Sequence, residues 1–278
     1  MTSPRLYPSD LSDAEWALIE PFIPPPRSGG PDGGRPATDR RAVVNAISYL
    51  VRTGCSWRQL PRDFPAWQTV YGYHKTWAED GTLERIHEAL RDQVRAAEGR
   101  EPEPTAGIVD AQSVKGADTV GAGTRGYDAG KKTNGRKRHV VVDTMGMVLA
   151  LVVTAANVQD RDGGRLVIEE AVKSHGQLTK VWADGGYAGK LVDWAVERLD
   201  VDLEIVRKRE GQRTFEVLPR RWVVERTLSW VVKCRRLVAD YERKIEHSLA
   251  MVRWAMIGLM GRRLARKVSD DVTAYNWE

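Results

Sequence analysis

Two carboxylates stand where the chain could hold a metal ion for chemistry. Asp110 ends an apolar run that begins at Ala106, and Asp184 ends another that begins at Val181. If the two runs are neighbouring parallel strands, about 4.8 Å apart, their side chains converge at the carboxyl edge of one sheet. Carboxylate oxygens suit hard divalent cations, and no histidine or cysteine cluster competes for that role. The pair therefore predicts a site for Mg²⁺ or Mn²⁺, with two ions roughly 3.5–4 Å apart.

A third carboxylate, Glu225, lies in a segment expected to be helical. Arg221 stands four residues before it, so the two side chains share one helix face, and Arg221 could orient the carboxylate or touch a phosphate. An ordinary surface ion pair, worth less than ~0.5 kcal/mol, would give the same spacing. Gly185 and Gly186 allow a tight turn after the second carboxylate and leave room for a phosphate. The predicted catalytic and metal-binding residues are Asp110, Asp184 and Glu225.

The elements around these residues predict a sheet flanked by helices. Strands are expected at 106–110, 136–143, 147–156, 180–184 and 201–206, and helices at 160–173, 190–199 and 219–267. The second and third strands form an antiparallel hairpin. This order predicts a mixed five-stranded α/β (or α+β) domain of ribonuclease-H-like order over residues 105–268. Asp143 and Asp160 flank the hairpin, and turn chemistry accounts for both.

The first hundred residues predict short helices separated by proline and glycine. Residues 1–98 fit an all-α domain of helix-turn-helix type, followed by a linker at 99–104; a tail is expected at 269–278. The segment 66–77 would be the recognition helix, with Gln68 and Lys75 as candidate base contacts. The side chains that it would offer to DNA are Gln68, Thr69, Tyr73, His74 and Lys75. Its aromatic side chains could equally form the core of a helical bundle.

Turn and cap residues delimit the first two of these helices. The first helix is expected near Leu11, with Ser12 as one candidate cap, and Thr38 is the expected cap of the second. A loop rich in proline and glycine is expected between them, over residues 24–34.

Positive charge is concentrated late in the chain. The net charge is +5, but residues 205–267 alone carry 17 basic and 6 acidic side chains. Such a segment would bind a polyanion if it faced one, and a solvated basic surface would have the same composition. A flexible basic loop is also expected at 125–138. The residues expected to contact DNA phosphates are Lys131, Lys132, Arg221, Lys233, Arg235 and Arg236.

Signals of export and membrane insertion are missing from the sequence. The chain opens with Met-Thr-Ser-Pro rather than a cationic start and an apolar run, and no apolar run approaches the roughly 18 residues of a span. Cys55 and Cys234 have no metal-binding spacing and are expected to be reduced thiols. We therefore expect a cytoplasmic protein.

Three motifs resemble those of a known family. The sequences Ile-Val-Asp-Ala-Gln-Ser-Val-Lys-Gly, Trp-Ala-Asp-Gly-Gly-Tyr and Arg-Trp-Val-Val-Glu-Arg-Thr-Leu are similar to the acidic motifs of bacterial insertion-sequence transposases of the DDE type. Leu-Ser-Asp-Ala-Glu-Trp and Ser-Trp-Arg-Gln-Leu-Pro resemble that family's helical leader domain. The resemblance implies two divalent metals, the terminal inverted repeats of a mobile element as substrate, a homodimer in a synaptic complex, and a place at the bacterial nucleoid.

The match departs from the family pattern at two positions. Leu218 stands where the third motif has a tyrosine, and Val232 stands where it has a basic residue, with Lys233 next. The leading hypothesis is that water cuts a phosphodiester at the element end and the freed 3′-hydroxyl then attacks target DNA. A ribonuclease-H-like nuclease that only hydrolyses DNA, and a catalytically silent DNA-binding repressor, are the alternatives. Strand transfer would distinguish the first, and metal-dependent cleavage the second.

Overall fold

The computed structural model describes residues 5–25, 36–206 and 219–275. The chain packs as two compact units, of which the first comprises the residues up to 102 together with 234–237 and those from 250 on. The second comprises 103–233 and 238–249. We call them the helical unit and the sheet unit. Residues 26–34 of the expected loop lie outside the described residues. So does Leu218, which stands where the family's third motif has a tyrosine.

The units differ from the expected domain boundaries at the C-terminal end. The sequence suggested a single catalytic domain from 105 to 268, whereas residues from Ala250 on belong to the helical unit. The expected tail at 269–278 also differs, because the last helix continues to Tyr275.

The helical unit is built from short helices whose ends carry recognisable caps. Ser12 accepts a hydrogen bond from the Glu15 N–H while Glu15 bonds back, which starts the first helix with a capping box. The second helix is capped by Asp39 rather than by Thr38, and Gly54 ends it in the left-handed conformation with φ 77°. The helices of this unit are α1 (Asp13–Ile19), η1 (Glu20–Phe22), α2 (Arg40–Thr53), η2 (Trp57–Gln59), α3 (Trp67–Glu79), α4 (Thr82–Ala97), η5 (Arg235–Leu237) and the larger part of α8 (Ile245–Tyr275).

Aromatic side chains of α3 form part of the core of the helical unit. His74 and Trp77 are buried, and the Trp254 ring of α8 lies 6.1 Å from the Trp77 ring. The Trp254 indole N–H donates to His74 Nδ1 at 3.2 Å. The sequence left open whether these aromatic side chains contact DNA or form the core of a helical bundle. His74 and Trp77 belong to the core.

The sheet unit contains all five predicted strands and a short sixth. They are β1 (Ala106–Lys115), β2 (Gly126–Asp128), β3 (Thr133–Asp143), β4 (Val148–Ala155), β5 (Lys180–Ala183) and β6 (Asp202–Ile205). β3 is antiparallel to β1, β2 and β4, whereas β1, β5 and β6 are parallel. Apart from β2, the strands and helices follow one another along the chain as the sequence predicted. In the sheet the strands lie in the ribonuclease-H-like order β4–β3–β1–β5–β6.

The expected flexible loop at 125–138 is partly regular structure. β2 and residues 133–138 of β3 lie in this segment. The side chains of Arg136, Lys137 and Arg138 are buried. Arg136 is held by Asp240 at 3.3 Å and by the Glu242 carbonyl at 2.8 Å. Arg136 is therefore structural because of partners about a hundred residues away in the sequence, which local sequence patterns do not reveal.

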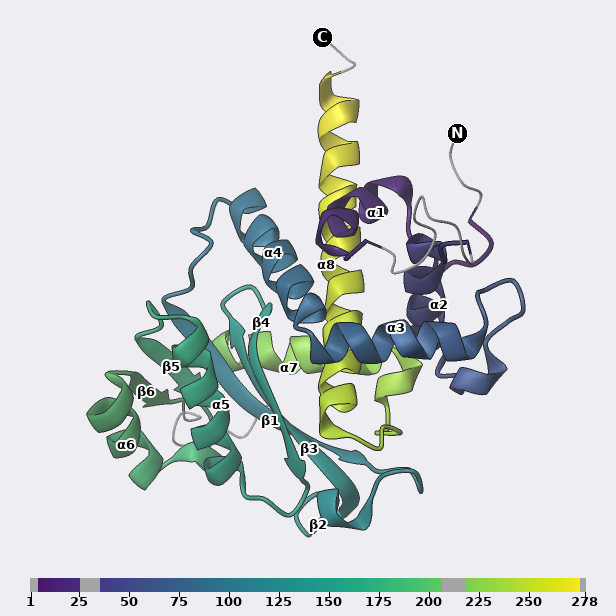
Figure 1. The fold of residues 1–278 in the computed structure, drawn as a ribbon. Coiled ribbons are helices and arrows are strands. Elements are labelled where there is room, and N and C mark those ends of the chain that lie inside the picture. Colours follow the sequence, from purple (N-terminus) through teal and green to yellow (C-terminus); the bar gives the residue numbers. More distant parts are fainter. Residues whose placement is uncertain (1–4, 26–35, 207–218, 276–278) are drawn as a thin grey trace. The chain divides into compact units, whose positions relative to one another are not determined.

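Three helices surround the sheet, namely α5 (Asp160–Ser174), α6 (Lys190–Leu199) and α7 (Pro219–Val232). In Figure 1, α5 lies in front of the strands and α7 behind them, and both contact β1 and β3. Gly163 and Gly164 let α5 approach closely, because a Cβ at these positions would lie 2.0 Å from the His139 ring and 2.6 Å from the Tyr187 ring. Among the described residues, no helix is long and apolar enough to cross a membrane.

Candidate active site

Asp110 lies in β1 and Asp184 directly follows β5, and these two strands are parallel neighbours, which is the condition that the predicted site required. The pairing of β1 with β5 ends with Ile108 opposite Trp182, and Asp110 and Asp184 each lie two residues further along their segments. Because neighbouring strands are about 4.8 Å apart, the two aspartates follow the same end of this strand pair. Asp110 is not at the end of its strand, however, because β1 continues to Lys115 along β3.

The setting of Asp110 disfavours its charged form. The pKa of its carboxyl is raised to about 6, chiefly by burial. The Ala111 N–H, 2.7 Å from Oδ1, lowers this pKa, the charge of Asp184 raises it, and Lys131 and Arg221 lower it. A cation at this place would offset both the burial and the repulsion between the two aspartates.

Asp184 is held at the end of β5 by the turn that follows. Its Oδ1 accepts the Gly186 N–H at 2.8 Å and so caps the short helix η4 (Gly185–Tyr187). Its other oxygen, Oδ2, lies 3.6 Å from Arg221 Nη2. A backbone donor and a guanidinium thus fix the two carboxylate oxygens on separate sides.

Glu225 is positioned because α7 is anchored to the β3–β4 turn. The hydroxyl of Thr227 donates to the Gly146 carbonyl at 2.8 Å, and Arg226 Nη2 donates to the Met145 carbonyl at 2.9 Å. One turn before Glu225, Arg221 Nη2 lies 3.4 Å from Glu225 Oε1. The same nitrogen that contacts Asp184 therefore contacts Glu225.

The carboxylate oxygens of Asp110, Asp184 and Glu225 suit a divalent cation, although the three side chains do not converge on one point. Within the described ranges, no three His, Cys, Asp or Glu side chains already form a cluster that could hold a metal ion. Asp110 and Asp184 supply hard oxygen donors, and Gly186 keeps the adjacent space free, because a Cβ there would stand 3.0 Å from Asp184 Oδ1. Glu225 would join the set by exchanging its contact with Arg221.

Three further side chains adjoin the carboxylates, and sequence reasoning either set them aside or missed them. Asp160, attributed to turn chemistry, is the first residue of α5, and its Oδ2 would lie 3.9 Å from a Cβ at Gly186. Lys137 contacts Asp160, and Tyr187 ends η4. Tyr187 is the last residue of the motif Trp-Ala-Asp-Gly-Gly-Tyr, so the sequence did carry a signal that it lies near Asp184. Asp143 does serve the turn, accepting the N–H groups of Met145 and Met147.

Most of the residues predicted to contact DNA are exposed. Gln68 and Lys75 lie on the solvent side of α3, and exposed side chains also occur at Lys131, Lys132, Lys233 and Arg235. Lys131 reaches towards the site and donates to the Ala111 carbonyl at 3.0 Å. Arg236 differs from the predicted phosphate contact, because its side chain is buried and donates to the Cys55 carbonyl at 3.2 Å. It therefore contributes to the packing of the helical unit. Cys55 and Cys234 are free thiols, as expected.

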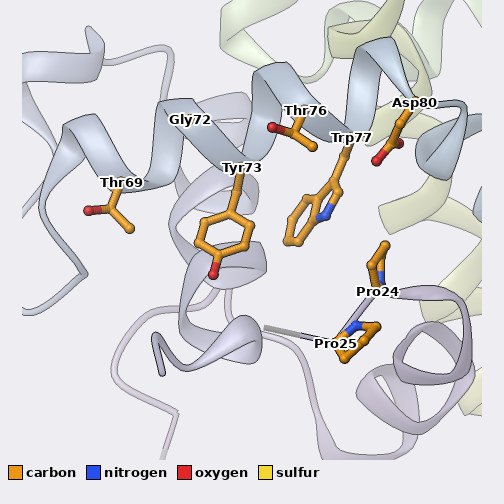
Figure 2. Close-up of a pocket in the computed structure, with 8 residues that line it drawn as sticks. All are labelled: Pro24, Pro25, Thr69, Gly72, Tyr73, Thr76, Trp77 and Asp80. Carbon is orange, nitrogen blue, oxygen red and sulfur yellow. The ribbon is translucent and has the colours of Figure 1, made fainter. Parts of the chain in front are cut away.

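A hollow of about 290 Å³ lies along one flank of α3 (Figure 2). Its lining comes from α3 and the residue after it (Thr69, Gly72, Tyr73, Thr76, Trp77 and Asp80) and from Pro24 and Pro25. Thr69 and Tyr73, which the sequence also offered to DNA, face this hollow. That leaves Gln68 and Lys75 as the exposed candidates on α3.

Two family models match the chain. "Putative transposase of IS4/5 family" matches residues 11–87, and "Transposase DDE domain" matches residues 101–259, which include all three carboxylates. The chain belongs to the DDE transposase family. Membership implies a phosphoryl-transfer enzyme that binds DNA, in a family that typically uses divalent metals.

Relatives of this transposase come from insertion elements. It is 32% identical over 120 residues to the "Insertion element IS402 uncharacterized 16.2 kDa protein" of Burkholderia cepacia, covering 41% of this chain and 77% of that protein. It is 30% identical over 119 residues to the "Putative transposase for insertion sequence element IS402" of the same organism, covering 40% of this chain and 56% of that protein. A solved structure, "Crystal structure of the Mos1 Strand Transfer Complex", is matched over 88% of this chain and 81% of that chain with a TM-score of 0.30 and 12% identity.

Proposed function

We propose that this transposase cuts the ends of an insertion sequence and joins the freed 3′-hydroxyls to target DNA, with Asp110, Asp184 and Glu225 as its catalytic carboxylates. The observation that supports this most is the parallel pairing of β1 with β5, because Asp110 and Asp184 each lie two residues beyond its last pair, while Arg221 contacts both Asp184 and Glu225. Cleavage breaks a P–O bond with water and leaves a 3′-hydroxyl. Joining forms a P–O bond from that hydroxyl to target DNA and releases the target's own 3′-oxygen.

Asp110, Asp184 and Glu225 would hold Mg²⁺ or Mn²⁺, two ions in our proposal. When bound, such ions activate the attacking oxygen and stabilise the leaving oxygen. Asp184 holds its orientation through the Gly186 N–H, and Glu225 through the anchored helix α7. Arg221, which contacts Asp184 and Glu225, would release both carboxylates to the cations and would then hold a DNA phosphate.

Recognition of the element ends is assigned to the helical unit. The exposed face of α3 would present Gln68 and Lys75 to the bases of the terminal inverted repeats. Lys131, Lys132, Lys233 and Arg235 would contact phosphates. We propose a homodimer that brings both element ends together in a synaptic complex, with residues 1–98 as the leader domain, 99–104 as the linker and the carboxylates in the domain that follows.

The experiment uses the full chain and a duplex with the sequence that flanks its own gene. With Mg²⁺ the wild type should produce new 3′-hydroxyl ends and join them to a target plasmid. Asp184→Asn and Glu225→Gln should abolish both products, whereas Asp193→Asn, which alters an exposed carboxylate on α6, should keep them. Cleavage by D184N at the wild-type rate would refute the site. Cleavage without joining would indicate a nuclease instead.

A further inference from the structure

Asp160 brings a carboxylate oxygen to the space beside Gly186. A Cβ at this glycine would stand 3.0 Å from Asp184 Oδ1 and 3.9 Å from Asp160 Oδ2. The two oxygens thus flank one small space that the glycine leaves open. Asp160 starts α5 whereas Asp184 ends β5, so two separate elements converge there.

The charge of Asp160 is only partly compensated. Its Oδ1 accepts from Lys137 Nζ at 2.9 Å, and the same ammonium lies 3.3 Å from Asp128 Oδ2. Asp128 also accepts the Ser113 hydroxyl at 2.6 Å, and this bond is the largest of the causes that lower its pKa to about 2. One ammonium therefore serves two carboxylates, which leaves a negative charge over and above those of Asp110 and Asp184.

A buried hydroxyl near these carboxylates is a second sign of a ligand site. The Tyr187 side chain is 1% exposed, and among the described residues its hydroxyl has no hydrogen-bond partner. Burial raises its pKa, and the charges of Asp110, Asp160 and Asp184 raise it further, so the hydroxyl keeps its proton. A buried hydroxyl without a partner is costly unless something, such as the water shell of an ion, accepts its proton.

We infer that Asp160 is a fourth carboxylate of the cation site, holding Lys137 through Oδ1 and facing a divalent cation beside Gly186 through Oδ2. This rests on the proposed function, because it assumes that Asp184 faces the same cation. Tyr187 closes the inner side of the site as a hydrogen-bond donor.

The test is a calorimetric titration of the full chain with Mn²⁺ alone, without DNA. Asp160→Asn should weaken Mn²⁺ binding by about 10- to 100-fold, a loss of the size seen when groups that support a metal site are removed. Asp162→Asn, which removes an exposed carboxylate two residues along the same helix turn, should keep the wild-type affinity. Circular dichroism without metal checks the fold, and Asp160→Ser serves as a second variant with the same expected loss.

The outcomes separate the two proposals. Loss of affinity in D160N and in D184N, with D162N unchanged, supports the inference. Wild-type affinity in D160N, while D184N loses binding, overturns the role of Asp160 and leaves the proposed function standing. Unchanged binding in D184N, or none in the wild type, overturns the cation site itself and the inference with it.

Discussion

Arg221 Nη2 lies 3.6 Å from Asp184 Oδ2 and 3.4 Å from Glu225 Oε1, so one guanidinium nitrogen joins carboxylates from a strand and a helix. Both contacts are partly exposed, and Arg221 itself is 25% exposed, so the energy of the pairs is small. Their value is geometric. The guanidinium partly neutralises the carboxylate charge that a cation would otherwise neutralise, and it keeps Asp184 and Glu225 turned towards each other.

We predict that Arg221→Ala reduces cleavage more than DNA binding. Without the guanidinium, the DNA phosphate that Arg221 is proposed to hold would lose its fixed place beside the carboxylates, and a misplacement of about 1 Å can cost about 100-fold in rate. The measurements are the rate of end cleavage under single-turnover conditions and the dissociation constant for the same duplex. Arg220→Ala is the matched control, because its neighbour Arg220 is exposed and stacks on Trp182, 4.3 Å from the ring centre. Equal losses in both variants would assign Arg221 to the helix surface.

Adjacent glycines offer a second test of the site. Gly186→Ala should lower cleavage and Mn²⁺ binding, because the new methyl group would stand 3.0 Å from Asp184 Oδ1 and displace that carboxylate. Gly185→Ala should leave both nearly unchanged, since a Cβ there meets nothing within 4 Å. The thermal midpoint of each variant shows whether the fold is kept. Identical behaviour of the two variants would argue against a ligand in this space.

Much of the sheet unit could be predicted because its apolar runs are local signals. A run that ends in an acidic residue marked Asp110 and Asp184, whereas the parallel pairing of their strands was an assumption that the structure supplies. The length of β1 could not be predicted, because Gln112 and Ser113 interrupt the apolar pattern. Its continuation depends on pairing with β3, in which buried cations such as Arg136 find partners far along the chain.

The helical unit and the edges of the site were less predictable for the same reason. His74 looks like a reader of DNA until Trp254, from the far end of the sequence, supplies its hydrogen bond. Arg236 looks like a phosphate contact until the Cys55 carbonyl accepts from it. Asp160 looks like turn chemistry, since only the fold brings it near Gly186. Local spacing carries no information on such partners.

Recognition by α3 is tested in the full chain, because a fragment of residues 1–98 would lack Trp254 and its contacts with the α3 core. We predict that replacing Gln68 and Lys75 with alanine removes the preference for the element end over random DNA. A good base contact is worth about 1–3 kcal/mol of discrimination. Lys173→Ala, an exposed lysine in the last turn of α5, is the control. A preference that survives in the double variant would move recognition to another surface.

Phosphate contacts are tested by salt. Replacing Lys233 and Arg235 should flatten the log–log salt dependence of duplex binding by up to about 2, because each phosphate contact contributes about 0.9. Binding to all sequences should weaken alike, since phosphates carry no base identity. Arg236→Ala should instead lower the thermal midpoint, because it removes a buried bond to the Cys55 carbonyl. An unchanged slope in the double variant would make these two cations solvated surface.

The last prediction concerns His139 and the stability of the sheet unit in acid. Burial lowers the pKa of this histidine from 6.5 to about 4, and the charge of Lys137 acts in the same direction. One ring nitrogen, Nε2, lies 3.0 Å from the Thr154 hydroxyl, and among the described residues the other has no partner to accept a second proton.

The unfolded chain therefore binds this proton more readily than the folded protein, and folding stability should fall as the pH drops from 6.5 towards 4. The full effect is on the order of 3 kcal/mol. Urea unfolding of the wild type and of His139→Gln at several pH values measures it. The variant should lose less stability over that window, whatever its stability at neutral pH, because glutamine does not titrate. Parallel curves for the two proteins would place the acid sensitivity in other groups.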